Sequence, residues 1–426
     1  MKRIIAGMIG AAVLGGAVVA QEVTFYNRMG SVLVNQPAVE NADADFGRLY
    51  DRIVGQYDSE KFSFFGRFEA ELMSNDGWDE HIGLGLGFDP EFNGAMRPLP
   101  FLEIALGNSY GTETPWEGYE LPGSYGYGSD VTYGRGLWAD GNGGTILFKG
   151  AGIGMDGLYI GWNILPITNA RNGGFKGKGF PDGWDTQLGL IYNVDGLLGI
   201  GVGAKLSTRK WTEGEDRNAN QQIGVYIEYT GVENLKVGAG VTMDTNSLGA
   251  AGDFIHESRG DELGFELGPI SQYVSLDRHE YGFVPFVNAG AEYNFAGMGL
   301  PITLGADVGL YAGAQTVVVN PDDEDVTMMP MLVGLLVRVD PMENLWFDVR
   351  AVYEDALLKG VPDGSDINLS RLTVTPRVHF LLSESDEFRL QVPIMTNWIP
   401  ETKAGGNFET STHTGFNIGV FWQHNF

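Results

Sequence analysis

Residues 62–72 read Phe62-Ser63-Phe64-Phe65-Gly66-Arg67-Phe68-Glu69-Ala70-Glu71-Leu72, with an apolar or small side chain at every second position. Side chains at alternate positions of a β-strand point to opposite faces, so this stretch predicts a strand with one apolar face and one largely polar face. The same period of two recurs at residues 82–88, 198–206 and 235–244. The repetition indicates an all-β chain.

We count sixteen such runs, and most have about the 9 to 11 residues that a tilted strand needs to cross a bilayer. The runs lie near residues 61–73, 79–88, 100–107, 145–154, 158–164, 186–193, 197–206, 221–230, 234–244, 281–295, 301–313, 327–340, 344–355, 369–382, 386–397 and 413–426.

The connections between the runs alternate in length. Short turns lie at residues 194–196, 231–233, 341–343 and 383–385, and long connections lie at 108–144, 165–185, 207–220, 245–280 and 398–412. Short turns on one side and long loops on the other are typical of outer-membrane barrels. We therefore expect a transmembrane antiparallel β-barrel of about 16 strands, within a range of 14 to 18, over residues 61–426.

A soluble β-sandwich would show the same alternation, so the positions of the aromatic residues decide between the two architectures. The core of a sandwich would place aromatic side chains in the middle of its strands, whereas a membrane barrel places them at the two interfaces. Here they lie near the ends of the runs, which favours the barrel. They are Phe62, Phe64, Tyr192, Tyr229, Tyr281, Phe283, Tyr293, Phe295, Phe388 and Trp422.

The composition excludes several classes of protein. The 426 residues include 55 Asp and Glu against 27 Lys and Arg, which argues against a nucleic-acid partner because the basic footprint is missing. The absence of Cys excludes a disulfide scaffold and a Cys-ligated zinc site. A mean hydropathy of -0.08 is far from that of a helical membrane protein.

The first 60 residues predict two segments outside the barrel. Residues 1–20 combine a basic start, an apolar run and small residues before Ala20, as in a secretory signal peptide that is cleaved after export. Residues 43–56 show helical spacing of apolar side chains. We expect residues 21–60 to form an N-terminal segment that either lies in the periplasm or plugs the lumen.

The last segment, residues 415–426, largely alternates apolar and polar side chains and ends on Phe426. It resembles the C-terminal assembly signal of Gram-negative outer-membrane proteins, whose terminal Phe is read by the barrel-insertion machinery. The whole chain thus resembles a porin-type outer-membrane barrel. The resemblance implies location in the bacterial outer membrane, with membrane lipid and the assembly machinery as partners, and it allows a homotrimer.

If the apolar faces point to lipid, charged side chains line the interior. Five arginines on consecutive runs would form one wall, and acidic residues on other runs would face it. Such an arrangement would set a transverse field that sorts ions, unless the charges simply pair with one another. The predicted pore-lining residues are Arg338, Arg350, Arg371, Arg377, Arg389, Glu69, Glu71, Glu228, Glu292 and Asp307.

The connection 108–144 is rich in aromatic and acidic residues, and long loops often carry function. One interpretation folds it into the lumen as a constriction, with Trp116, Glu117, Tyr119 and Glu120 lining the narrow part. The alternative is an external loop, which is the usual place for loops.

Motifs for catalysis and cofactors are weak. Residues 150–154 and 199–203 alternate glycines without opening a helix, as a nucleotide loop would. The acidic run 322–325 lacks the spacing of an EF-hand. We expect no enzyme activity, no cofactor and no metal.

The sequence predicts a passive diffusion channel for small hydrophilic solutes or ions, with a preference for cations. Two alternatives stay open. One is a plugged transporter for hydrophobic compounds, and the other is an adhesin that acts through its loops.

Overall fold

The computed structural model describes the strands of the chain and most of the short turns. The described residues are 23–36, 48–74, 84–107, 143–166, 184–194, 197–207, 222–244, 284–311, 315–317, 326–329, 331–355, 357–359, 368, 370–402 and 408–425. Within these ranges, no helix has the length and apolar character needed to span a membrane. The predicted signal peptide, the predicted constriction residues and Phe426 lie outside the described residues and stay predictions.

The described secondary structure consists of strands and two short 3-10 turns. The strands are β1 (Val23–Gln36), β2 (Arg48–Asp58), β3 (Phe62–Ser74), β4 (Leu84–Leu99), β5 (Leu102–Gly107), β6 (Gly143–Lys149), β7 (Leu158–Pro166), β8 (Trp184–Val194), β9 (Leu198–Ser207), β10 (Gln222–Val232), β11 (Leu235–Asp244), β12 (Val284–Asn294), β13 (Ile302–Tyr311), β14 (Gln315–Val317), β15 (Val326–Met328), β16 (Met331–Met342), β17 (Leu345–Asp355), β18 (Ser370–Leu381), β19 (Asp386–Gln391), β20 (Ile394–Thr402) and β21 (Phe408–Asn425). The turns are η3 (Gly150–Ile153) and η6 (Phe295–Met298).

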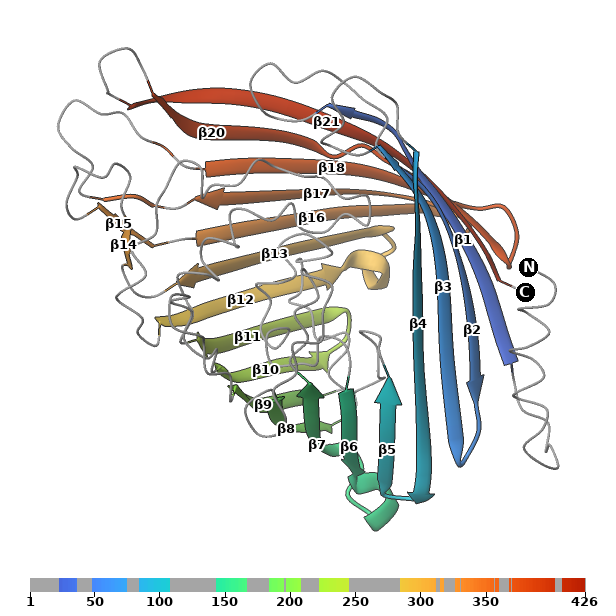
Figure 1. Ribbon diagram of the computed structural model, residues 1–426. Coiled ribbons are helices and arrows are strands. Elements are labelled where there is room, and N and C mark those ends of the chain that lie inside the picture. Colours follow the sequence, from blue (N-terminus) through green and yellow to red (C-terminus); the bar gives the residue numbers. More distant parts are fainter. Residues whose placement is uncertain are drawn as a thin grey trace.

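The strands form a closed ring, as Figure 1 shows. From β1 to β19 each wall strand pairs antiparallel with the next, β13 pairs directly with β16, β20 pairs with β18 and β21, and β14 and β15 form a separate hairpin. The ring closes because β1 pairs on one side with β2 and on the other with β21. Every described wall strand therefore has a neighbouring strand on both sides, as a lipid environment requires, and the pairing of β4 with β5 begins at Asn93.

The sheet contains 19 strands, but β19 and β20 occupy one position in the wall. Both pair with β18 on one side and with β21 on the other, one after the other along the chain. The break falls at Val392 and Pro393, and Pro376 lies across from it on β18. Because proline has no N–H to donate, the ladder is interrupted there. The wall is therefore an antiparallel barrel of 18 strands, at the upper limit of the predicted range.

The prediction that residues 21–60 lie outside the barrel wall is wrong. β1 and β2 are wall strands: Tyr26 pairs with Asn425, and Arg48 pairs with Met73. The helical spacing was misleading because β2 carries apolar side chains on both faces, with Ile53 outward and Val54 inward, which obscures the period of two. Each of the sixteen predicted runs lies on a wall strand, and β1 and β2 raise the count to 18.

The two faces of the wall differ in polarity, as the alternation predicts. On β13, Leu304 and Val308 point outward and are 43% and 48% exposed, whereas Thr303 and Asp307 point inward and are buried. Four of the exposed aromatic side chains, Phe62, Phe64, Tyr192 and Tyr229, lie near the short turns, whereas Trp162 and Phe416 are exposed inside β7 and β21. These four residues confirm the predicted position of aromatics at strand ends, where a membrane interface would lie.

The short turns lie at the end of the barrel that also holds Val23 and Asn425, since Val23 pairs beside the β2–β3 turn and Asn425 donates its N–H to Ser385 in the β18–β19 turn. The described strand ends that flank the predicted long connections lie at the opposite end of the barrel. One of these predicted connections is wrong, because most of residues 398–412 belong to β20 and β21, and only 403–407 lie between these strands.

Candidate functional site in the barrel lumen

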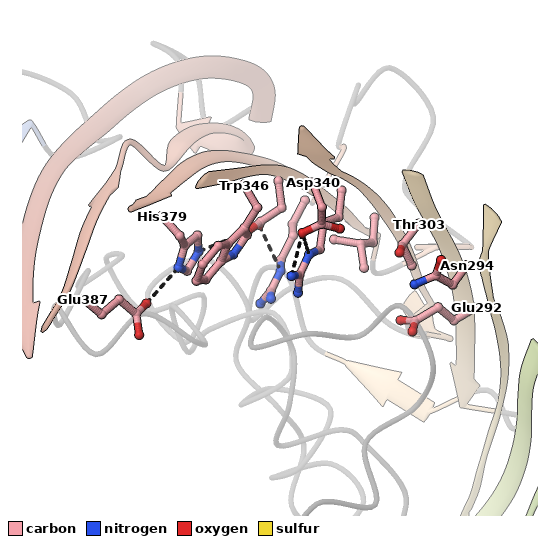
Figure 2. A pocket seen from close by; sticks show the side chains of 11 residues that line it. Glu292, Asn294, Thr303, Asp340, Trp346, His379 and Glu387 are labelled. Carbon is pink, nitrogen blue, oxygen red and sulfur yellow. Dashed lines mark hydrogen bonds and ion pairs between the residues drawn. The ribbon is translucent and has the colours of Figure 1, made fainter. Parts of the chain in front are cut away.

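A recess of about 380 Å³ opens on the inner face of the barrel toward the short-turn end. Figure 2 shows Glu387, His379, Trp346 and Asp340 along one side of it, and Thr303, Asn294 and Glu292 along the other. Side chains of both charge signs and one large aromatic ring therefore line the same space. The lining residues are Glu292, Asn294, Thr303, Leu336, Arg338, Asp340, Trp346, Asp348, Arg350, His379 and Glu387.

Trp346 forms the flat part of this wall. It lies directly across from His379 in the β17–β18 register, and the two rings stack with centroids 4.7 Å apart and planes 14° apart. On the other side of β17, Arg338 of β16 places its guanidinium carbon 5.3 Å from the centroid of the Trp346 ring. Arg338 is held in turn by Asp340, 2.7 Å from its guanidinium. Trp346 thus joins a cation and an imidazole in one stack.

Asp348 is the centre of the charge network. Its carboxylate is 4% exposed and lies 3.4 Å from Nε of Arg350, 3.9 Å from Nε of Arg377 and 3.2 Å from Nε2 of His379. The other ring nitrogen of His379 lies 3.0 Å from Oε1 of Glu387. One carboxylate therefore balances several donors, and the second carboxylate fixes the orientation of the imidazole.

A second buried ion pair lies farther from the short turns. Arg371 and Glu354 occupy directly opposed positions on β18 and β17. Their side chains are buried, and the guanidinium of Arg371 donates to Oε2 of Glu354. Because both groups are withdrawn from water, removal of either one would leave a buried unpaired charge.

Arg389 contacts an aromatic ring at the place where the barrel closes. Its guanidinium carbon lies 4.3 Å from the centroid of the Phe421 ring on β21. Arg28 of β1, on the other side of β21, lies 5.6 Å from the same ring. Cations from both neighbouring strands therefore hold Phe421 on the inner face of the wall.

The predicted acidic residues lie on several strands and share no single site. Glu228 lies 3.2 Å from Nζ of Lys236, and Glu292 lines the recess. Asp307 is buried against Gly334, and within the described part of the chain neither of its carboxylate oxygens has a hydrogen-bond partner. Glu69 and Glu71 belong to β3, and their side chains lie outside what the structure describes.

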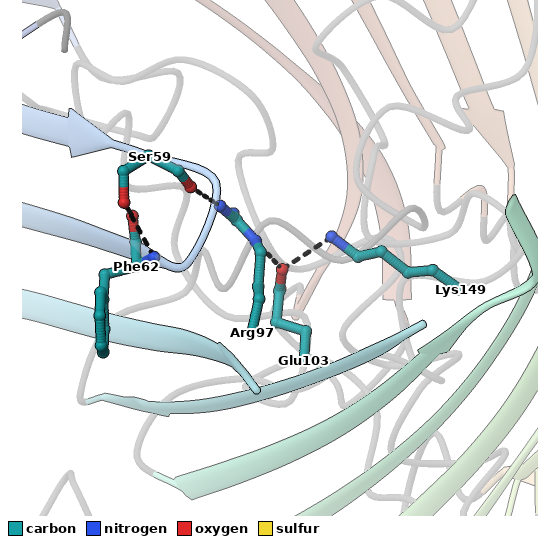
Figure 3. Close-up of polar contacts among 5 residues, drawn as sticks. All are labelled: Ser59, Phe62, Arg97, Glu103 and Lys149. Carbon is teal, nitrogen blue, oxygen red and sulfur yellow. Dashed lines mark hydrogen bonds and ion pairs between the residues drawn. The ribbon is translucent and has the colours of Figure 1, made fainter. Parts of the chain in front are cut away.

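A cluster that the sequence analysis did not single out lies at the same end of the lumen, on β4 to β6. Glu103 is buried and accepts hydrogen bonds from Nε of Arg97 and from Nζ of Lys149, each at 2.7 Å. Arg97 also donates to the backbone oxygen of Ser59 in the β2–β3 turn, as Figure 3 shows. The cluster ties this turn to β5 and β6.

The structure places the five predicted arginines on four adjacent strands, β16 to β19, and on the inner face. It also places acids among them, at Asp340, Asp348, Glu354 and Glu387. The contacts of these acids fit the predicted alternative to a transverse field, in which the charges pair with one another. Sequence reasoning passed over Trp346 and Arg28. Trp346 stands at alternate positions with Asp348 and Arg350, and this period of two was the signal that could have placed it on the inner face. Arg28 was missed because residues 21–60 were assigned to a segment outside the wall.

Comparison with known proteins connects this barrel to solved structures. No protein-family model and no curated protein sequence matches the chain. Pseudomonas aeruginosa OccK8 (OprE) superposes with a TM-score of 0.54 and 10% identity, covering 95% of this chain and 98% of that chain. The chain has a porin-type barrel fold. Two further structures share the porin-type barrel. P. aeruginosa OpdQ superposes with a TM-score of 0.54 and 10% identity, covering 96% of this chain and 99% of that chain. Acinetobacter baumannii OccAB3 superposes with a TM-score of 0.52 and 10% identity, covering 95% of this chain and 100% of that chain. At these identities the likeness concerns the fold alone.

Proposed function

We propose that the protein is an outer-membrane channel through which small hydrophilic solutes and ions diffuse passively. One observation carries the proposal: the closed wall of 18 strands is apolar and exposed on its outer face and charged on its inner face. A wall of this kind suits hydrocarbon outside and water inside, and barrels of 16 to 18 strands are wide enough for an aqueous channel.

The mechanism we propose is physical and not enzymatic. Moving an ion from water into hydrocarbon costs tens of kcal/mol by Born estimates, and a water-filled lumen removes most of that cost. The recess beside Trp346 would lie on the path near the short-turn end. Its paired charges give a solute hydrogen-bond donors and acceptors without a strong net field.

Cation preference is the selectivity we propose. Acidic residues outnumber basic ones by 55 to 27 in the whole chain, and several connections at the long-loop end are acidic, such as residues 318–325. An acidic mouth raises the local concentration of cations and lowers that of anions. The pairing of Arg350, Arg371 and Arg377 with acids supports this preference, because a paired arginine opposes cations less than an isolated one.

The alternatives have less support. A plugged transporter needed residues 21–60 as its plug, and β1 and β2 are part of the wall. An adhesin would act through loops that lie outside the described residues. The signal peptide, the assembly machinery as a partner and a homotrimer stay predictions.

Planar-bilayer recording tests the proposal. The purified protein is inserted from one side, and current is recorded in symmetric salt and then in a salt gradient. We expect discrete conductance steps and a reversal potential of the sign set by cation flow. Insertion without current would contradict the channel, whereas a reversal potential of the opposite sign would contradict only the cation preference.

A further inference from the structure

His379 lines the recess and lies between two carboxylates. Its Nδ1 lies 3.0 Å from Oε1 of Glu387 on β19, as the dashed line in Figure 2 shows, and its Nε2 lies 3.2 Å from Oδ2 of Asp348 on β17. A neutral imidazole has one N–H for these two acceptors, whereas the protonated ring has an N–H for each. The site therefore accommodates both forms of the ring.

The stack with Trp346 holds the ring at the surface of the recess. The side chain of His379 is 10% exposed, and 4.7 Å separates the centroids of the imidazole and the indole. A cation also binds to the face of an indole, so protonation of the ring preserves this contact. A change in charge at His379 is thus possible without a change in the shape of the wall.

Several other charged groups face His379 or the space in front of it. Arginines stay charged in proteins, and carboxylates ordinarily gain a proton only below about pH 5. Histidine ordinarily changes its charge between about pH 5 and 8, and His379 is the only histidine among the described residues that line the recess. The other charged groups are Arg377 on β18, Asp348 and Arg350 on β17, Glu387 and Arg389 on β19, Arg338 and Asp340 on β16, and Glu292 across the recess on β12.

A proton on His379 would add one positive charge to this wall. The nearby arginines already have acids beside them, because Asp340 lies 2.7 Å from Arg338 and Asp348 lies 3.4 Å from Arg350. Charged side chains that line a pore favour ions of the opposite sign. The protonated ring would therefore repel cations and attract anions in the recess.

We propose that His379 makes the ion selectivity of the channel depend on pH. The neutral ring leaves the cation preference in place, and the protonated ring weakens it. The inference rests on the proposed channel function and adds to it the residue through which the selectivity responds to acid. His379 acts directly on the passing ions, since it lines the recess.

Reversal potentials in a gradient of dilute salt, recorded at pH 8 and at pH 5, test the proposal. We expect the ratio of cation to anion permeability of the parent protein to fall about twofold at pH 5, the effect of one unit charge at roughly 8 Å in water. His379→Gln is neutral at both pH values and should keep the ratio that the parent protein has at pH 8. His379→Arg is charged at both pH values and should keep the ratio that the parent protein has at pH 5.

His424→Gln is the matched control. Nδ1 of His424 also contacts a carboxylate, 2.8 Å from Oδ1 of Asp386. His424 is three positions from the inward Phe421 on β21, so the alternation of the strand turns it to the outer face. This variant should respond to pH as the parent protein does. Far-UV circular dichroism shows that each variant has the β-structure of the parent protein.

Three results would overturn the role of His379 in a conducting channel. They are a parent protein whose selectivity is the same at pH 8 and pH 5, a response to pH in His379→Gln as large as in the parent protein, and equal permeability ratios in His379→Gln and His379→Arg. Each of these results would leave the proposed channel function standing. Insertion of the parent protein without current would instead contradict the channel function, and this inference with it.

Discussion

His379 stacks on Trp346 with 4.7 Å between the ring centroids, and the same indole lies 5.3 Å from the guanidinium carbon of Arg338. The three side chains come from the adjacent strands β18, β17 and β16. The stack turns three independent side chains into one surface, because each neighbour restricts the rotation of the indole. A rigid, partly apolar surface in a charged lumen defines the shape of the recess.

Removal of Trp346 should widen the recess. We expect Trp346→Ala to raise single-channel conductance, because a large ring leaves the lumen and water takes its place. Trp346→Phe keeps a ring between Arg338 and His379 and should stay close to the parent value. Recording of both variants in the same salt checks the prediction. A conductance that is unchanged in Trp346→Ala would mean that the recess does not lie on the conducting path.

Asp348 should control both stability and selectivity. Asp348→Asn removes the carboxylate that Arg350, Arg377 and His379 contact. Loss of one partner in a buried pair costs about 3–5 kcal/mol of unfolding free energy. The unbalanced arginines should also shift the reversal potential toward anions.

Asp340→Asn is the matched control for this prediction. Asp340 and Arg338 form an ion pair at 2.7 Å, shorter than any contact of Asp348, but their side chains are 33% and 44% exposed. Exposed pairs contribute about 0–1 kcal/mol, so urea unfolding in lipid vesicles should show little change. Equal losses in the two variants would contradict the importance of burial at Asp348.

The architecture could be predicted from the sequence wherever one face of a strand is apolar and the other is not. On β13, Leu304, Ala306 and Val308 alternate with Thr303, Gly305 and Asp307, and this alternation predicts the strand correctly. On β2, Val54 and Ile53 are both apolar, and a period of two disappears. The N-terminal pair of strands is specified by its pairing with β21 and β3, which no local pattern contains.

The candidate site was predictable only as a set of inward positions. Alternation places Arg350 and Arg377 on the polar face, but it does not say that Asp348 lies between them. That neighbourhood depends on the register of β17 and β18, which sets Asp348 opposite Arg377. A shift of one residue would send Asp348 to the outer face.

Glu103 should hold together the short-turn end of β4, β5 and β6. Glu103→Leu leaves the cations of Arg97 and Lys149 without their shared carboxylate, and we expect a loss of about 3–5 kcal/mol. Amide exchange should also become faster around Ser59, since Arg97 binds its carbonyl oxygen. Glu343→Gln in the exposed β16–β17 turn is a control for the loss of a negative charge. Unchanged exchange around Ser59 would show that the turn holds its shape without the cluster.

Two glycines in the connection between β6 and β7, which contains the η3 turn, allow the cost of a left-handed backbone to be distinguished from the cost of a steric overlap. Gly154 and Gly157 both have a positive φ, 79° and 80°. A Cβ at Gly154 would meet no atom within 4 Å, whereas a Cβ at Gly157 would overlap the backbone oxygen of Asn193. Gly154→Ala should cost only the left-handed backbone, about 1–2 kcal/mol. Gly157→Ala should cost a further 1–3 kcal/mol or so, because the β7–β8 backbone must move.

Urea unfolding in vesicles measures both losses, and the difference between them is the test. The N–H of Asn193 donates to the carbonyl of Gly157 over 2.9 Å, so a shift of either strand also weakens this bond. Equal destabilisation by the two substitutions would contradict the close approach of Gly157 to β8. A larger loss at Gly157 would show that backbone contact between the short turn and the neighbouring strand, and not turn conformation alone, fixes this end of the barrel.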